Sequence, residues 1–279
     1  MAENEDPQDQ AAPEEATPAP EPEAAAPAPK EGSEPLGKLL QREEEFHAGE
    51  RFLGVFHSPN RVFNHVYAAE SWGFPFLVLV LVWGLALGVY SLRMDWVGFL
   101  EPWAELVGRE LPESVAEAFQ GRWGVLIKAG AAVALVACWV ILPLFVVGLV
   151  YFALFRVLGK DLTFRHSMGV VCYAKLVGVI PAGLMIIMAV GRSPEMLNIL
   201  NPLPTNAAFF LSDLHPGWVA LWAQLDLFTL WGLILMTLGY AIVAGATRPV
   251  SFLAVFLPWI ILVGGLSVLA GATGAAPGS

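Results

Sequence analysis

Two ionisable residues lie inside or beside stretches of the chain that are otherwise apolar, and they are the first candidates for chemistry. Lys175 stands within the apolar stretch 168–190, and Asp226 directly precedes the apolar stretch 227–247. A charge in hydrocarbon is costly, so such residues usually face a partner or a water-filled cavity. One interpretation of Lys175 and Asp226 is therefore a polar intramembrane site, of the kind that a small-solute transporter or channel would use.

The same two residues have a simpler interpretation, which we favour at this stage. The aliphatic stem of Lys175 can carry its ammonium to the inner headgroups of a membrane, while Asp226, near Trp222 and Gln224, lies at the outer interface. Lys175 would approach Asp226 only if the fourth apolar helix began as early as Trp218.

Residue patterns typical of catalysis or metal binding are absent from the sequence. It contains no H-E-x-x-H, G-x-S-x-G, P-loop or G-x-G-x-x-G pattern. His47, His57 and His65 are too scattered to be read as metal ligands, and Cys138 and Cys172 both fall in apolar stretches where cysteine commonly packs. We expect no enzyme activity, no cofactor and no metal, and no nucleic-acid partner.

The elements that must position these residues are long apolar stretches. Five of them are candidate transmembrane helices, at 71–92, 129–155, 168–190, 227–247 and 250–271. A helix needs about 20 apolar residues to cross the hydrocarbon core of a membrane. The hydrophobic content of 56% also excludes an ordinary soluble domain. The sequence predicts an all-α, polytopic membrane bundle of five transmembrane helices over 71–272, with a short tail at 273–279.

The N-terminal region differs from the rest of the chain. Residues 1–37 are rich in Ala, Pro and Glu and carry most of the acidic excess behind the net charge of −10. Such a segment has too few large hydrophobic residues to offset the entropy of ordering, so we expect disorder. An acidic, proline-interrupted start also lacks the features of a secretory signal. A solvated extension is the favoured interpretation, and no binding role is assigned to it.

Residues 38–70 read as an amphipathic juxtamembrane region. Ser58 is placed to cap a helix whose first position is Pro59, with Phe63 on its apolar face and Arg61 and His65 pointing elsewhere. Such a helix lies on the membrane surface or connects to the bundle by packing against it, and we favour the connector. The aromatic and acidic segment 93–128 predicts a second interfacial helix.

Small residues and prolines within the spans predict how the helices pack. Gly84 and Gly88 form a G-x-x-x-G pair, which lets helix backbones approach closely, and we favour packing within one chain over a dimer interface. Pro143, Pro181 and Pro258 fall inside the second, third and fifth stretches, where each favours a kink.

Basic residues near the span ends are almost evenly divided between the two sides, so they decide orientation weakly. Translocation of a long acidic tail without a signal sequence is an improbable route. We therefore expect the N-terminus inside and the C-terminus outside. The link 156–165 and the tight turn at Arg248 and Pro249 would then face the cytoplasm, and the loop that opens at Arg192 would face outward.

The order of these elements resembles the Yip domain family of membrane proteins, over about residues 51–269. The resemblance rests on a Ser-Pro and amphipathic segment before five spans, on the entry to the third span, and on the start of the fourth. These positions are Phe56, Ser58, Pro59, Val62, Phe63, Leu162 to Ser167, Val171, Tyr173, Ala174, Pro181, Asp226, Phe228 and Trp231.

The resemblance implies a five-span bundle with a cytoplasmic N-terminal region and no catalytic residue to carry over. Eukaryotic members act in vesicle traffic with Rab-type GTPases, commonly as oligomers or mixed complexes. The richness in Gly, Ala, Val and Leu and the absence of retrieval signals favour a bacterial inner membrane, which has no Rab partner.

The leading hypothesis is a non-enzymatic scaffold or adaptor in the membrane. Its cytoplasmic face would include Ser58, Pro59, Phe63 and Arg165 and would meet proteins or anionic headgroups. The expected partners are membrane lipids, a protein bound through the N-terminal region, and further copies of the chain. The alternative is the transporter or channel that uses Lys175 and Asp226.

Overall fold

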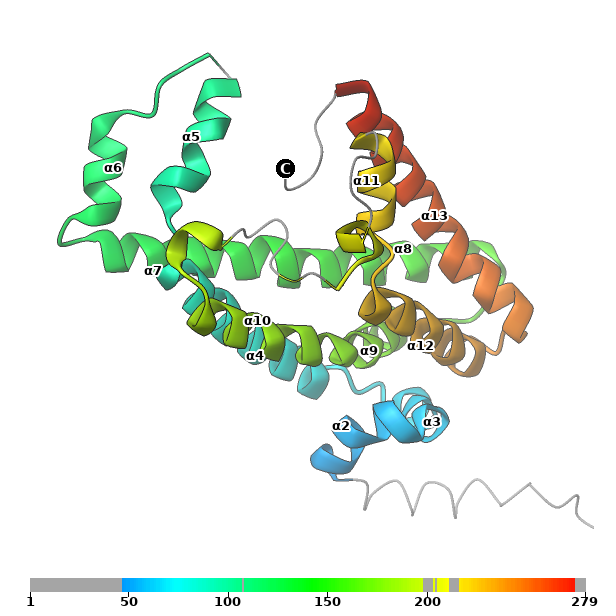
Figure 1. Ribbon diagram of the computed structural model, residues 1–279. Helices are drawn as coiled ribbons and strands as arrows, with labels where there is room; N and C mark the ends of the chain where they lie inside the picture. Colours follow the sequence, from blue (N-terminus) through cyan, green and yellow to red (C-terminus); the bar gives the residue numbers. More distant parts are fainter. Residues whose placement is uncertain (1–46, 107, 198–202, 204, 211–215, 274–279) are drawn as a thin grey trace, which may run out of the picture. The chain divides into compact units, whose positions relative to one another are not determined.

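The computed structural model describes residues 47–106, 108–197, 203, 205–210 and 216–273. The predicted tail 1–37 lies outside the described residues, as does the predicted tail 273–279 apart from Thr273, which ends the last helix. Within them the chain is helical, without a β-strand (Figure 1). The α-helices are α2 (Ala48–His57), α3 (Pro59–Ala69), α4 (Gly73–Arg93), α5 (Trp96–Leu106), α6 (Glu113–Gln120), α7 (Gly124–Val136), α8 (Leu142–Val157), α9 (Phe164–Lys175), α10 (Val179–Gly191), α11 (Pro216–Ala223), α12 (Leu227–Val243) and α13 (Arg248–Thr273).

The helical membrane bundle is confirmed, but the count of five spans is not matched exactly. Four helical segments of the described chain are long and apolar enough to cross a membrane: α4, α7 with α8, α9 with α10, and α13. The fifth, α12, has 17 residues, at the lower limit of about 17–25 residues for a span. It ends at Val243 rather than at 247, because Gly245 takes a left-handed conformation (φ 56°) that terminates the helix.

Two of the predicted kinks are irregular turns that precede a proline. A π-helical turn at Ala137–Ile141 joins α7 to α8 just before Pro143, so that the two helices form one continuous rod (Figure 1). A 3₁₀ turn at Leu176–Gly178 joins α9 to α10 just before Pro181. Proline lacks the N–H that would bond the carbonyl four residues earlier, and it is tolerated in the first turn of a new helical segment.

The spans are apolar on the surface as well as in the core. On α4, Leu77, Leu81 and Leu85 are exposed on one face, while Leu79 and Leu87 are buried. A helix that is apolar all round needs an apolar environment on both sides. The exposed leucines are therefore the surface that contacts lipid.

Helix α9 is the most enclosed part of the bundle. Its residues from Ser167 to Ala174 are all buried, and it contacts α2, α3, α4, α8 and α12. The Ser167 hydroxyl lies 2.7 Å from the Gly148 carbonyl oxygen, to which it donates a hydrogen bond, and 2.8 Å from the Tyr240 hydroxyl. The Ser167 hydroxyl is therefore satisfied by neighbouring helices rather than by water, as hydrocarbon surroundings require.

Loop contacts link pairs of segments that the sequence assigned to the same side of the membrane. The Lys160 ammonium donates to the Gly245 carbonyl oxygen at 3.0 Å. The Arg93 guanidinium donates to the Arg192 carbonyl oxygen at 3.3 Å. The predicted interfacial segment 93–128 forms two helices, α5 and α6.

Candidate functional site

A cavity inside the bundle brings Lys175 and Asp226 together. Its volume is about 350 Å³, and it lies between α4, the π-helical turn with α8, the junction of α9 and α10, and the start of α12. Lys175 is the last residue of α9, and Asp226 is the N-cap of α12. Helix α12 does not extend back to Trp218, because the helical conformation is interrupted between α11 and α12 and a new helix begins after Asp226.

Asp226 is held by the helix that it caps, and one of its oxygens has no hydrogen-bond partner in the described part of the chain. Oδ2 accepts hydrogen bonds from the backbone N–H of Thr229 at 2.9 Å and from its hydroxyl at 3.3 Å. Oδ1 is buried and has no hydrogen-bond partner in the described part of the chain. The carboxylate is therefore fixed in position with one oxygen unsatisfied.

The walls of the cavity combine aromatic rings with irregular backbone. Trp83 and Trp139 both line it, and the Trp83 indole packs against the backbone at Gly178, where a Cβ would lie 3.3 Å from its Nε1. The turns before Pro143 and Pro181 contribute to the lining as well. Non-helical backbone at membrane depth is usually found where it lines a cavity or is buried in protein.

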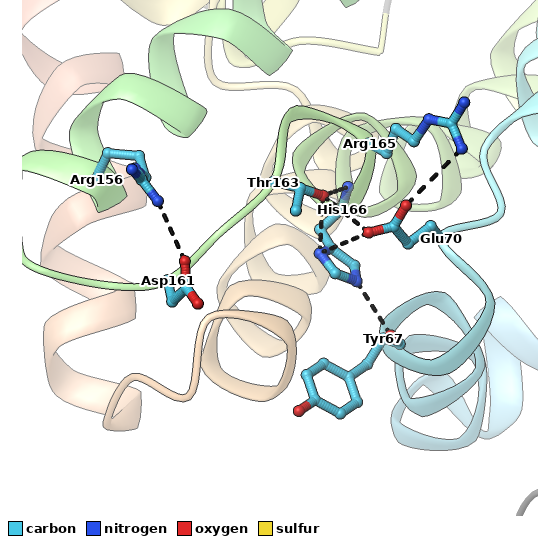
Figure 2. Close-up of polar contacts among 7 residues, drawn as sticks. All are labelled: Tyr67, Glu70, Arg156, Asp161, Thr163, Arg165 and His166. Carbon is cyan, nitrogen blue, oxygen red and sulfur yellow. Dashed lines mark hydrogen bonds and ion pairs between the residues drawn. The ribbon is translucent and has the colours of Figure 1, made fainter.

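A second polar cluster joins the end of α3 to the start of α9 (Figure 2). Glu70 lies 3.3 Å from the Thr163 hydroxyl, 3.7 Å from His166 Nδ1 and 3.9 Å from the Arg165 guanidinium. His166 Nε2 lies 3.1 Å from the Tyr67 carbonyl oxygen, which can only accept, so Nε2 carries a proton. We call these five residues the α3–α9 junction.

The backbone of Glu70 is strained at this junction. Glu70 has φ 47°, and it is the only non-glycine residue with positive φ in the described part of the chain. A left-handed conformation at a residue with a Cβ costs roughly 1–2 kcal/mol. Glycine would take this C-cap position without that cost, but glycine could not make the carboxylate contacts to α9.

Helices α2 and α3 are also joined to each other by a polar contact. The Arg51 guanidinium lies 2.9 Å from His65 Nε2. Burial and the nearby Arg51 charge lower the pKa of His65 below its usual value. His65 is therefore neutral in the folded chain, and its Nε2 accepts the hydrogen bond from Arg51.

The structure places the predicted juxtamembrane residues with two corrections. The helix begins at Pro59 as expected, but the Ser58 side chain makes no capping hydrogen bond, because Ser58 is shared between the end of α2 and the start of α3. Phe63 is fully buried against the bundle, while Arg61 is exposed. His65 is also buried rather than directed away from the apolar face.

The predicted glycine pair divides between two environments. A Cβ at Gly84 would lie 3.9 Å from the Val136 side chain of α7, whereas a Cβ at Gly88 would meet no atom within 4 Å. Closer approaches occur at glycines that sequence reasoning missed. A Cβ at Gly239 would lie 2.6 Å from Val170, and one at Gly169 would lie 2.5 Å from Val66.

Metal ions need donor sets of several side chains placed close together. Among the described residues, no group of three or more His, Cys, Asp or Glu side chains is arranged to hold a metal ion. Cys138 and Cys172 are free thiols. The α3–α9 junction had a partial sequence signal, since Thr163 precedes the helix that contains Arg165 and His166.

These features define a polytopic helical membrane protein in which an amphipathic helix pair packs onto the bundle that follows it. The sequence model of the Yip1 domain matches residues 53–269, so the chain belongs to the Yip1 domain family, and the expected resemblance is confirmed. The match runs from α2 to α13 and includes both polar sites. No curated protein and no solved structure matches the chain.

Proposed function

We propose that this protein is a non-enzymatic scaffold or adaptor in a membrane. The membrane is the inner membrane of a bacterium, and the N-terminus lies in the cytoplasm. The observation that carries the proposal is the strained Glu70, whose carboxylate ties α3 to Thr163, Arg165 and His166. A non-glycine residue kept in a left-handed conformation indicates that this joint is maintained for a purpose beyond closing the helix.

The α3–α9 junction offers groups that a protein or an anionic headgroup could contact. The Arg165 side chain is 72% exposed, and Tyr67, whose ring stacks on His166, is 58% exposed as a residue. Because Phe63 and Val66 are fully buried against the bundle, the polar groups sit on a rigid support. A rigid patch with an exposed arginine and an exposed aromatic ring is typical of a protein contact surface.

Affinity capture of the full-length protein in nanodiscs tests the proposal. Arg165→Glu and Tyr67→Ala should each reduce recovery of a defined protein partner by roughly tenfold or more. Arg122→Glu is the matched control, because Arg122 is an exposed arginine in a different segment, beside Trp123. A partner recovered equally with every variant, or lost equally with the control, would refute the adaptor function of this junction.

A deletion separates the junction from the acidic tail. Removing residues 1–46 leaves α2 and α3 intact, and it distinguishes a partner bound by the tail from one bound by the junction.

A second candidate function, the small-solute transporter or channel, is favoured only by the cavity that contains Lys175 and Asp226. Solute movement lost in Lys175→Leu and Asp226→Leu, with partner capture unchanged, would select it.

A further inference from the structure

The cavity between α4, α8, α9 and α12 is lined by one basic and one acidic side chain that do not bond to each other. Lys175 and Asp226 both line it. Within the described chain, however, no ion pair or hydrogen bond joins them, and Asp226 Oδ1 has no hydrogen-bond partner. Buried charges in membrane proteins normally pair with each other or face a polar ligand. A basic and an acidic side chain that line one cavity without pairing fit a ligand that carries both complementary charges.

We propose that this cavity binds a small zwitterionic group, in which one molecule carries a primary ammonium and an anionic carboxylate or phosphate. The anionic oxygen of the ligand accepts hydrogen bonds from the Lys175 ammonium. The ligand ammonium is held by the Asp226 carboxylate. An anion alone would leave Asp226 unsatisfied and facing a like charge, and a cation alone would do the same to Lys175.

The remaining walls agree with this chemistry. Trp83 and Trp139 supply aromatic faces on which a ligand ammonium is attracted by the ring electrons. The aliphatic lining from Leu79, Leu87 and Leu144 suits a hydrocarbon portion of the ligand. The volume of about 350 Å³ lies within the range of about 300–1,000 Å³ typical of small-molecule sites.

Two sources can provide this group, a free aliphatic amino acid and the headgroup of an ethanolamine phospholipid. They share a primary ammonium close to an anionic oxygen. The binding site does not depend on the scaffold function, since its residues are separate from the α3–α9 junction. Loss of partner capture in Arg165→Glu therefore leaves this inference untouched, and loss of ligand binding leaves the scaffold untouched.

Binding is measured on the full-length protein in phosphatidylcholine nanodiscs. Native mass spectrometry compares added phosphatidylethanolamine with added phosphatidylcholine, which has the same phosphate but a quaternary ammonium that cannot donate a hydrogen bond. A second arm titrates leucine against leucinamide, which lacks the carboxylate. The ethanolamine lipid or leucine should bind about tenfold or more tightly than its matched control, the ratio expected for one hydrogen bond to a charged group.

The variants are chosen to preserve the fold. Asp226→Asn keeps an effective N-cap for α12, and Lys175→Met replaces the ammonium with an apolar side chain of similar length. Asp226→Asn should remove the discrimination against phosphatidylcholine, and Lys175→Met should weaken leucine or headgroup binding about tenfold or more. Arg165→Gln, an exposed charge outside the cavity, is the control and should change neither.

The two arms identify the source, and either one can support the inference. Selective binding of the ethanolamine lipid alone indicates a headgroup site, whereas selective binding of leucine alone indicates a site for free amino acids. The inference is overturned if neither ligand is preferred over its control, or if Asp226→Asn keeps the full preference. Should Lys175→Met fail to fold, Asp226→Asn decides the question by itself.

Discussion

Replacing Gly239 by alanine should loosen the point at which α3, α9 and α12 meet. A Cβ at this position would lie 2.6 Å from Val170 Cγ1 and 2.9 Å from Phe63 Cε1. Both neighbours are fully buried, and a β-branched valine in a helix has little freedom to rotate away. Overpacking of this kind costs roughly 1–3 kcal/mol. Alanine also removes the cost of glycine within a helix, which stabilises the fold by roughly 0.5–1 kcal/mol. This gain must be separated from the cost of overpacking.

Gly88→Ala provides that separation. Gly88 also lies inside a helix, but a Cβ there would meet no atom within 4 Å. The difference in stability between the Gly239→Ala and Gly88→Ala variants therefore measures the overpacking alone. The double variant Gly239→Ala/Val170→Ala should recover part of the loss, because the closest clash is then removed.

Cys172 is a natural reporter for the point at which α3, α9 and α12 meet. Its thiol is fully buried in α9, two residues from Val170, whereas Cys138 is exposed and is replaced by serine for the assay. Labelling by a membrane-permeant maleimide follows local opening. Opening in Gly239→Ala should exceed that in Gly88→Ala by about 5- to 150-fold. Equal labelling in the two variants would mean that α3 is not held by this close approach, and the packing argument would fail.

Three further perturbations test other contacts. Burial, together with the nearby Arg51 charge, lowers the pKa of His65 below 6.5, so the unfolded chain takes up this proton at a higher pH than the folded chain does. Thermal stability should therefore fall as the pH drops below about 6.5, and His65→Gln should flatten that profile. Thr163→Ala removes the N-cap of α9 and should cost about 1 kcal/mol, a loss of a few degrees in Tm that Thr163→Ser should avoid. Tyr240→Phe deletes the 2.8 Å contact with Ser167 and should cost about 1 kcal/mol. If the double variant with Ser167→Ala lost as much Tm as the two single variants together, a direct hydrogen bond would be contradicted.

The fold was predictable because its main signal is the length of uninterrupted apolar sequence. A stretch that avoids charge for about 20 residues has few alternatives to a membrane helix. The ends of the helices were less predictable, since they depend on local backbone conformation. Helix α12 ends at Val243 because Gly245 becomes left-handed, and hydropathy does not distinguish that glycine from one inside a helix.

The candidate sites were predictable as residue types and not as neighbours. Lys175 and Asp226 were noticeable because charge is rare in this part of the chain, but their shared cavity depends on the break before α12. The strained Glu70 and the close approaches at Gly169 and Gly239 carry no local signal. Whether a glycine is needed for packing depends on which helix lies opposite, and that is a property of the tertiary fold.

Helix α9 explains why a lysine and an N-terminal polar cluster occur on one membrane-spanning segment. Its middle is buried by five other helices, so its small and polar residues never meet lipid and need not be apolar. Its first turn holds the α3–α9 junction through Thr163, Arg165 and His166, and its last residue is Lys175. These two ends lie along one helix axis, at a spacing set by the rise of roughly 1.5 Å per residue. A single enclosed helix therefore fixes both the α3–α9 junction and the cavity lysine, and neither can be displaced along that axis without moving the other.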